Sequence, residues 1–241
     1  MVVDLSADFR LSNAETYAEV YGSEHPATLL ARNNVAASLL RLARHKEAER
    51  QLRIVIEASQ PPDLDTAAAM DNLALILALT DRLQEAAAIN ARVLELRESL
   101  LSKDHLRVAH TLRNRAQIML ELDDFEQALQ FARRAKEIYL LNGGESSPNI
   151  TPTDRTVAQA LLDLHRPQEA ADLLEATWAR EMATPSGPGV PVIVATELAE
   201  ALCWENRRRC SLRKVASVDS SSLEGDRDRQ MRNANLSRPS S

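Results

Sequence analysis

The stretch YGSEHPATLLARNNVAASLLRLARHKEAERQL, residues 21–52, holds a histidine before a proline, a double asparagine and a Glu-Ala pair. Two of these features recur at the same intervals of 38, 42 and 42 residues. The position of the second asparagine is occupied in successive units by Asn34, Asn72, Asn114 and Thr156. The alanine that follows an acid or amide recurs as Ala48, Ala86, Ala128 and Ala170. Two markers with one period indicate a tandem repeat, and repeats of this length are typical of solenoids.

Each repeat has the pattern of two paired helices. In the first unit, apolar residues with helical spacing run from Leu29 to Leu42, the pattern breaks at residues 43–45, and a second series runs from Ala48 to Ile56. Loop-forming sequences occupy residues 59–63, 102–105 and 142–152. Prolines suit the first turn of a helix, where a missing N–H costs nothing, and the register position of His25 recurs with good N-cap residues. These first-turn and cap residues are Pro26, Pro152, Asp63 and Ser147.

Composition supports an all-helical chain. Hydrophobic residues make up 44% of the 241 residues but aromatic residues only 3%, and Gly is limited to 6. Strand-forming residues are therefore too sparse for a large sheet. The sequence has neither an apolar run of membrane-spanning length nor the pattern of a secretory signal, and we predict no membrane contact. Two cysteines without a disulfide pattern favour a reducing compartment, which predicts a cytoplasmic location.

The charge is unevenly distributed along the chain. The formal net charge is −6, from 29 basic and 35 acidic residues, but residues 205–241 hold nine basic and five acidic ones, or +4. The rest of the chain is therefore at −10, and an acidic body repels nucleic acid phosphates. We predict no nucleic-acid partner. The end of the chain has almost no apolar periodicity, which predicts a basic, disordered tail.

The quoted stretch resembles the tetratricopeptide repeat, and specifically the longer type found in kinesin light chains and related proteins, with its G-x-x-H-P, N-N-L-A and E-A-E elements. The resemblance covers roughly residues 13–204 and implies an α-α superhelix of stacked antiparallel helix pairs. We expect an N-terminal partial repeat helix at residues 1–21, a solenoid at 22–204 and the tail at 205–241. The expected repeats are 22–60, 61–101, 102–144, 147–184 and a partial one at 185–204.

Residues 2–27 also resemble, locally, a segment of N-acetyl-gamma-glutamyl-phosphate reductase. That family's Asn-Pro-Gly-Cys element is absent, and so is any G-x-G-x-x-G loop. Without nucleophile or dinucleotide loop, the segment cannot bring that chemistry with it. No other catalytic constellation is present: no glycine precedes a lysine, Cys203 and Cys210 lack ligand spacing, and His105 and His110 are five residues apart. We therefore predict a non-enzymatic protein with no cofactor and no metal.

The resemblance implies that the first helices line a concave groove. Residues three positions before the small alanine would project into it, and in the kinesin-light-chain type asparagines at this position clamp the backbone of a bound peptide. Here the position reads Asn33, Asp71, Arg113 and Arg155. One helical turn on either side adds Leu30, Ala37, Ala68, Leu75, His110 and Gln117. Asn34, Asn72 and Asn114 are expected to bond to the adjacent helix or repeat instead.

The departures from asparagine suggest a groove that is acidic near the second unit and basic toward the third and fourth. Arginines there could receive an acidic peptide by bidentate contacts. The alternative is that Asp71 and Arg113 pair with neighbours or face water. The leading hypothesis is a scaffold or adaptor that binds a peptide or protein segment in the groove.

A second hypothesis is a structural or sensor fragment of a larger multidomain protein, whose exposed solenoid ends stack on another domain or on another copy. In the tail, Ser211 and Ser217 follow basic residues and resemble kinase acceptor sites, and the alternative there is a solvated charge run.

Overall fold

The computed structural model describes residues 14–187 and 189–204, and these residues form helices without any strand. The helices are α2 (Pro26–Arg41), α3 (His45–Ala58), α4 (Leu64–Leu79), α5 (Leu83–Leu100), α6 (Leu106–Glu121), α7 (Phe125–Gly143), η1 (Gly144–Ser146), α8 (Ile150–Asp163) and α9 (Pro167–Ala183). Residues 14–21 and 190–204 are also helical. None of the helices in these ranges is long and apolar enough to cross a bilayer.

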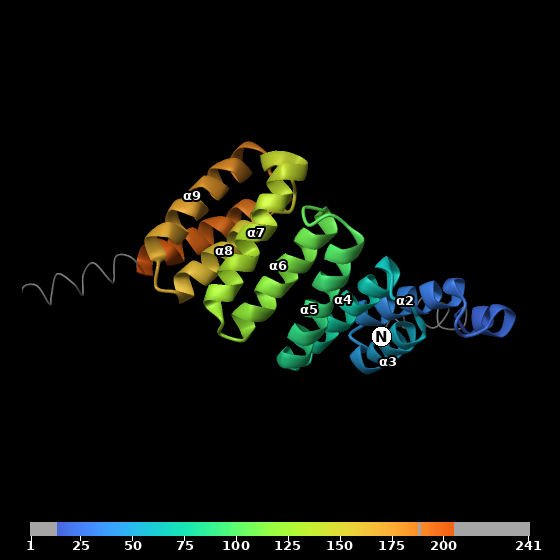
Figure 1. Cartoon of the computed structure of the whole chain (residues 1–241). Helices are drawn as coiled ribbons and strands as arrows, with labels where there is room; N and C mark the ends of the chain where they lie inside the picture. The colour runs from blue at the N-terminus through green and yellow to red at the C-terminus, as the bar shows by residue number, and fades with distance from the viewer. Residues whose placement is uncertain (1–13, 188, 205–241) are drawn as a thin grey trace, which may run out of the picture. The chain divides into compact units, whose positions relative to one another are not determined.

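The chain forms two compact units, one up to Leu164 and the other from His165 onward. In the first unit, α2 to α8 pack against their neighbours in chain order, so that successive antiparallel pairs lie side by side (Figure 1). The second unit contains α9 and helix 190–204.

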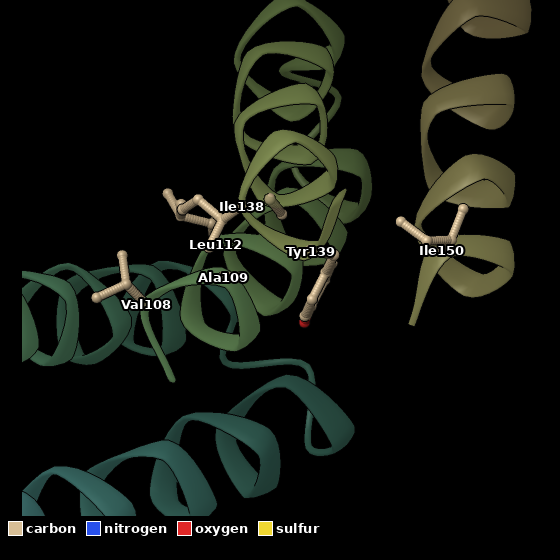
Figure 2. Packing of buried hydrophobic residues seen from close by; sticks show 7 residues of the cluster. Val108, Ala109, Leu112, Ile138, Tyr139 and Ile150 are labelled. Carbon is tan, nitrogen blue, oxygen red and sulfur yellow. The ribbon is translucent and has the colours of Figure 1, made fainter. Parts of the chain in front are cut away.

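Small and medium apolar residues fill the space between the helices of the first unit. One cluster joins α6, α7 and the start of α8, with Leu112 and Ile138 packed between α6 and α7 (Figure 2). Another joins Met70 of α4 to Val93 of α5, with Ile56 of α3 against it. The marker alanines after the acid or amide, from Ala48 to Ala170, are all fully buried. Helices approach closely at these positions because the side chain is a single methyl group.

The turn inside each helix pair repeats the same backbone conformation. The second residue after the end of the first helix has a left-handed φ of 56° to 61° in each of the four described pairs, and none of these residues is glycine. They are Ala43, Asp81, Asp123 and His165, at the intervals of the repeat. In the first three pairs the next residue donates its N–H back to the first helix, as Arg44 does to the Leu39 carbonyl. This turn reverses the chain so that the second helix can lie against the first.

The helix starts agree with the sequence prediction except in the fourth pair. His25 and His105 each cap their helix by accepting a backbone N–H on Nδ1, and Pro26 occupies the first position of α2. Asp63 forms a reciprocal capping box with Thr66. Ser147 is not the N-cap of α8, which begins at Ile150 after Asn149. The prediction failed there because α7 continues to Gly143 and a 3-10 turn uses the following residues.

Candidate functional site: the first-helix row

The predicted groove residues of the described range lie on α2, α4, α6 and α8. We call Asn33, Asp71, Arg113 and Arg155 the first-helix row, because they occupy one register position on the first helix of successive pairs. All four are half-buried. Beside them, Leu30 is 50% exposed and Leu75 is 48% exposed. Gln117 is exposed as well, whereas Ala37, Ala68 and His110 are half-buried.

Asn33 contacts the next helix pair through its side chain. Its Oδ1 accepts a hydrogen bond from Asn72 Nδ2 at 3.2 Å, which joins α2 to α4. Asn72 therefore acts as a repeat-to-repeat hydrogen bonder, as predicted. Asn34, at the equivalent position of the first unit, is exposed instead. The described residues hold no first helix ahead of α2 that could offer Asn34 a partner like Asn33.

Asp71 is neutralised by an arginine that the sequence analysis missed. Arg97, near the end of α5, places Nη1 2.6 Å from Asp71 Oδ2, and both side chains are largely buried. The same guanidinium donates to Thr111 Oγ1 and to the Arg107 carbonyl on α6. Burial raises the pKa of Asp71 above its ordinary value, although Arg97 opposes the shift. The expected acidic end of the groove is thus corrected: its carboxylate is already bound within the fold.

The first basic residue of the row, Arg113, lies on α6. Arg113 Nη1 donates to Asn149 Oδ1 at 3.2 Å, just before α8. One turn earlier, His110 Nδ1 lies 3.1 Å from the buried Tyr139 hydroxyl of α7, and the two rings meet edge to face at 5.5 Å. Burial lowers the pKa of His110, and the nearby Arg113 and Arg97 lower it further. The imidazole is consequently held neutral at pH values where an exposed histidine begins to protonate.

A register position at the end of the second helices supplies the missed partners. It reads Ser59, Arg97, Tyr139 and Glu181, and it is polar or polar-tipped in every unit. Arg97 contacts Asp71, Tyr139 contacts His110, and Glu181 accepts from the Ser186 N–H and hydroxyl. All three of these side chains are more than nine-tenths buried. A polar residue at a recurring buried position is the sequence signal that could have identified them.

The structure therefore brings together only some of the predicted site. Arg97 pairs with Asp71, and Arg97 and Arg113 both lower the pKa of His110, whose burial lowers it most. A hydrogen bond joins the Asn33 side chain to Asn72, which lies beside the row and is not a member of it. Arg155 is half-buried on α8. Within the described residues, no three potential metal ligands gather in one place.

Ser211 and Ser217, the predicted kinase acceptor sites, lie outside the described residues. The same holds for the residues before position 14 in the reductase-like segment. Neither prediction is tested by the structure.

Known proteins resemble this chain in its helical-repeat fold. Residues 65–140, from the first turn of α4 to the last turns of α7, match the family model for the tetratricopeptide repeat. No curated protein matches the chain in sequence. The reductase-like segment stays an observation on the sequence alone.

Three of these structures are informative. The TPR-like repeats of a kinesin light chain candidate from Podosopora anserina match with a TM-score of 0.68 and 19% identity, over 84% of this chain and 98% of that one. BtubC (BKLC) from P. vanneervenii matches with a TM-score of 0.72 and 16% identity, over 98% and 92%. Pseudomonas aeruginosa pilF matches with a TM-score of 0.55 and 19% identity, over 73% and 68%.

The fold is therefore an all-α tetratricopeptide-type helical repeat, and its solved neighbours include structures of the kinesin-light-chain type. At these identities the likeness shows the fold alone. The ligand of this particular chain has to be argued from its own residues.

Proposed function

We propose that this chain is a non-enzymatic adaptor that binds a peptide or protein segment along the first-helix row, and that it prefers acidic segments. The observation that carries the preference is the charge of α6. This helix contains Arg107, Arg113 and Arg115 and no carboxylate before Glu121, its last residue. The nearest acid of the row, Asp71, is held by Arg97. On the row itself, a ligand carboxylate would meet Arg113, and the neighbouring Asp71 would not compete for it because Arg97 already binds that carboxylate.

Exposed leucines beside the first-helix row also favour this face as the binding surface. Leu30 and Leu75 each expose about half of their surface beside polar members of the row. Apolar side chains next to hydrogen-bonding groups are typical of surfaces that bind an extended segment, since they add buried area to directional contacts. A cytoplasmic location remains the prediction from the sequence.

The test is an array of immobilised peptides graded from acidic to basic. We expect the wild-type chain to bind acidic peptides, with binding that weakens as salt is added. Arg113→Ala should reduce binding about tenfold or more, the loss of one charge-assisted contact. Arg92→Ala is the matched control, because Arg92 is exposed on α5 and lies outside the row. An unchanged set of bound peptides in both Arg113→Ala and Asn33→Ala would show that the row is not the binding site.

A second candidate function is assembly through the start of the first unit. Tyr17, Val20 and Tyr21 are 36%, 66% and 55% exposed on helix 14–21. The rings of Tyr17, Tyr21 and His25 stack in series, at centroid distances of 5.7 and 5.0 Å. Such an apolar, aromatic face suits contact with another copy or domain. Sedimentation velocity on wild type and on Val20→Ser/Tyr21→Ser tests this: a wild-type monomer at all concentrations would exclude self-association.

A further inference from the structure

Helix 190–204 of the second unit, VPVIVATELAEALCW, is apolar on nearly all sides. Its charged residues are Glu197 and Glu200. Yet among its residues only Val194 and Ala201 are fully buried. Four large apolar side chains of the helix remain 41% to 69% exposed: Val192, Ile193, Leu202 and Trp204. A helix that is hydrophobic on all sides is normally covered by other parts of a protein. The described residues leave these apolar side chains uncovered.

The surroundings of this helix are acidic. The described residues of the second unit contain two basic residues, Arg166 and Arg180, and six acidic ones, for a net charge of −4. Arg166 is already engaged by Glu169 at 2.6 Å. An apolar surface with an excess of carboxylates favours a partner that is both apolar and basic.

Such a segment follows the helix directly. Residues 206–217, NRRRCSLRKVAS, contain five basic residues and no acidic one. Leu212 and Val215 are interspersed as apolar residues. A segment tethered at Trp204 is present at an effective concentration of about millimolar, which no separate partner of equal affinity can match.

We propose that residues 206–217 of this chain cover the exposed apolar face of helix 190–204, with their arginines and lysine against the acidic second unit. This contact is independent of the peptide-binding proposal, because it involves neither the first-helix row nor any residue of α2 to α8.

The contact has a built-in point of control. Ser211 lies inside the segment and Ser217 at its end, and both follow basic residues. A phosphate adds a charge of about −1.5 to −2, which the carboxylates of the second unit repel and the neighbouring arginines attract. Phosphorylation would therefore release the segment and expose the apolar face.

The two tryptophans of the chain make this measurable. Both Trp178 and Trp204 lie in the second unit, and Trp204 stacks on His165 at 5.4 Å while 41% exposed. In a full-length Trp178→Phe background, Trp204 is the single reporter. Acrylamide is the quencher, because a neutral molecule does not respond to changes in protein charge. Reversal of Arg207, Arg208 and Arg209 to Glu should raise the quenching constant roughly twofold and shift emission to longer wavelength, because uncovering restores water contact to a large indole surface.

The matched control reverses Arg227, Arg229 and Arg232 to Glu, which changes the net charge equally but lies outside the segment. We expect no change in quenching from it. Equal quenching in wild type and in the first variant would overturn the proposal. Protection of Trp204 that disappears on dilution would also overturn it, since the cover would then be a second copy. Ser211→Glu/Ser217→Glu should expose Trp204 partly, and no effect there would overturn the phosphorylation step.

Discussion

The turns between paired helices and the first-helix row occupy register positions of the same repeat, but they use them in opposite ways. In the turns, every unit keeps the left-handed residue, and three of the four units place an Arg and a Glu three residues apart after it. In the first-helix row, the residue type changes from Asn to Asp to Arg, and each characterised side chain finds a different partner. Backbone geometry is thus repeated, while side-chain pairing is specific to each junction.

The difference lies in what each position must satisfy. A chain reversal needs one backbone conformation, and several residue types can adopt it at a modest cost. A half-buried polar group needs a partner at hydrogen-bond distance, and that partner is set by the neighbouring helix. Turn contacts should therefore be individually weak and interchangeable, whereas row contacts should be individually strong. The following predictions test this contrast, from the largest expected effect to the smallest.

Breaking the buried ion pair should have the largest effect. Arg97→Met leaves Asp71 buried without its cation, and the free energy of unfolding should fall by about 3–5 kcal/mol. Urea denaturation measures this loss. The matched control is Arg44→Met in the exposed pair with Glu47, where we expect about 0.5 kcal/mol or less. Equal losses in the two variants would contradict the contrast between row and turn.

The same pair makes a prediction about pH. Burial raises the pKa of Asp71 above the unfolded value near 3.8, so the folded state binds more protons than the unfolded state as pH falls. In Arg97→Met the stability loss should accordingly shrink toward low pH, as Asp71 takes up a proton. The double variant Asp71→Leu/Arg97→Met should recover most of the loss at neutral pH.

Replacement of a buried polar residue that departs from the repeat, Asn90, should increase the stability of the protein. Asn90 of α5 is fully buried, and its amide has no hydrogen-bond partner among the described residues. The same register position is Leu52, Ala132 and Leu174 in the other units. Asn90→Leu should raise the free energy of unfolding by about 1–3 kcal/mol, because it removes an unpaired buried amide. The reverse change, Leu52→Asn, is the control and should lower it; a loss from Asn90→Leu would refute this reading.

Removal of a helix cap should have an intermediate effect that depends on pH. Asp63 accepts the N–H groups of Asp65 and Thr66 at the start of α4, and Asp63→Ala should cost about 1 kcal/mol at neutral pH. Its hydrogen bonds to Thr66 lower the pKa of Asp63 below 3.8, so this stability is present above pH 3.8 and disappears as pH falls through the folded pKa. In thermal melts, Asp63→Ala should have a lower melting temperature than Asp65→Ala near neutral pH. The two melting temperatures should converge in acid.

The smallest effect is expected in a turn. Ala43 has a φ of 56°, a conformation that costs an L-residue more than glycine. Ala43→Gly should raise the free energy of unfolding by about 0.5 kcal/mol, after the larger entropy of glycine in the unfolded chain is subtracted. Ala31→Gly, inside α2, should instead lower it by about 1 kcal/mol. If both variants lower the free energy of unfolding equally, the backbone of Ala43 is not strained in the turn.

Much of the fold could be predicted from residue spacing. The loops at 59–63 and 102–105 fall between the observed helices, and the helix starts at Pro26 and Leu64 follow their predicted caps. The left-handed turn residues were missed because Ala, Asp and His carry no glycine signal. The start of α8 was misplaced because Ser147 is a good cap residue whose position was taken by the extension of α7.

The candidate site was less predictable. Residue spacing correctly placed the first-helix row on successive helices, and it identified Asn72 as a bridge between repeats. It did not show that Asp71 is neutralised, since Arg97 lies on another helix and its long side chain reaches both α4 and α6. Which groups the Arg97 side chain can contact depends on the distances between helices. The repeat register of the sequence does not specify those distances.

The sequence by itself determined the helical class, the period and the positions of most helix ends, because these depend on local spacing and local backbone preferences. Only the tertiary structure decided which polar groups are consumed inside the fold and which remain for a partner. The pairing of Asp71 with Arg97 and of His110 with Tyr139 arises from packing between helices. Electrostatic and hydrogen-bonded contacts depend on separations of a few ångströms between side chains far apart in the chain, and packing alone sets those separations.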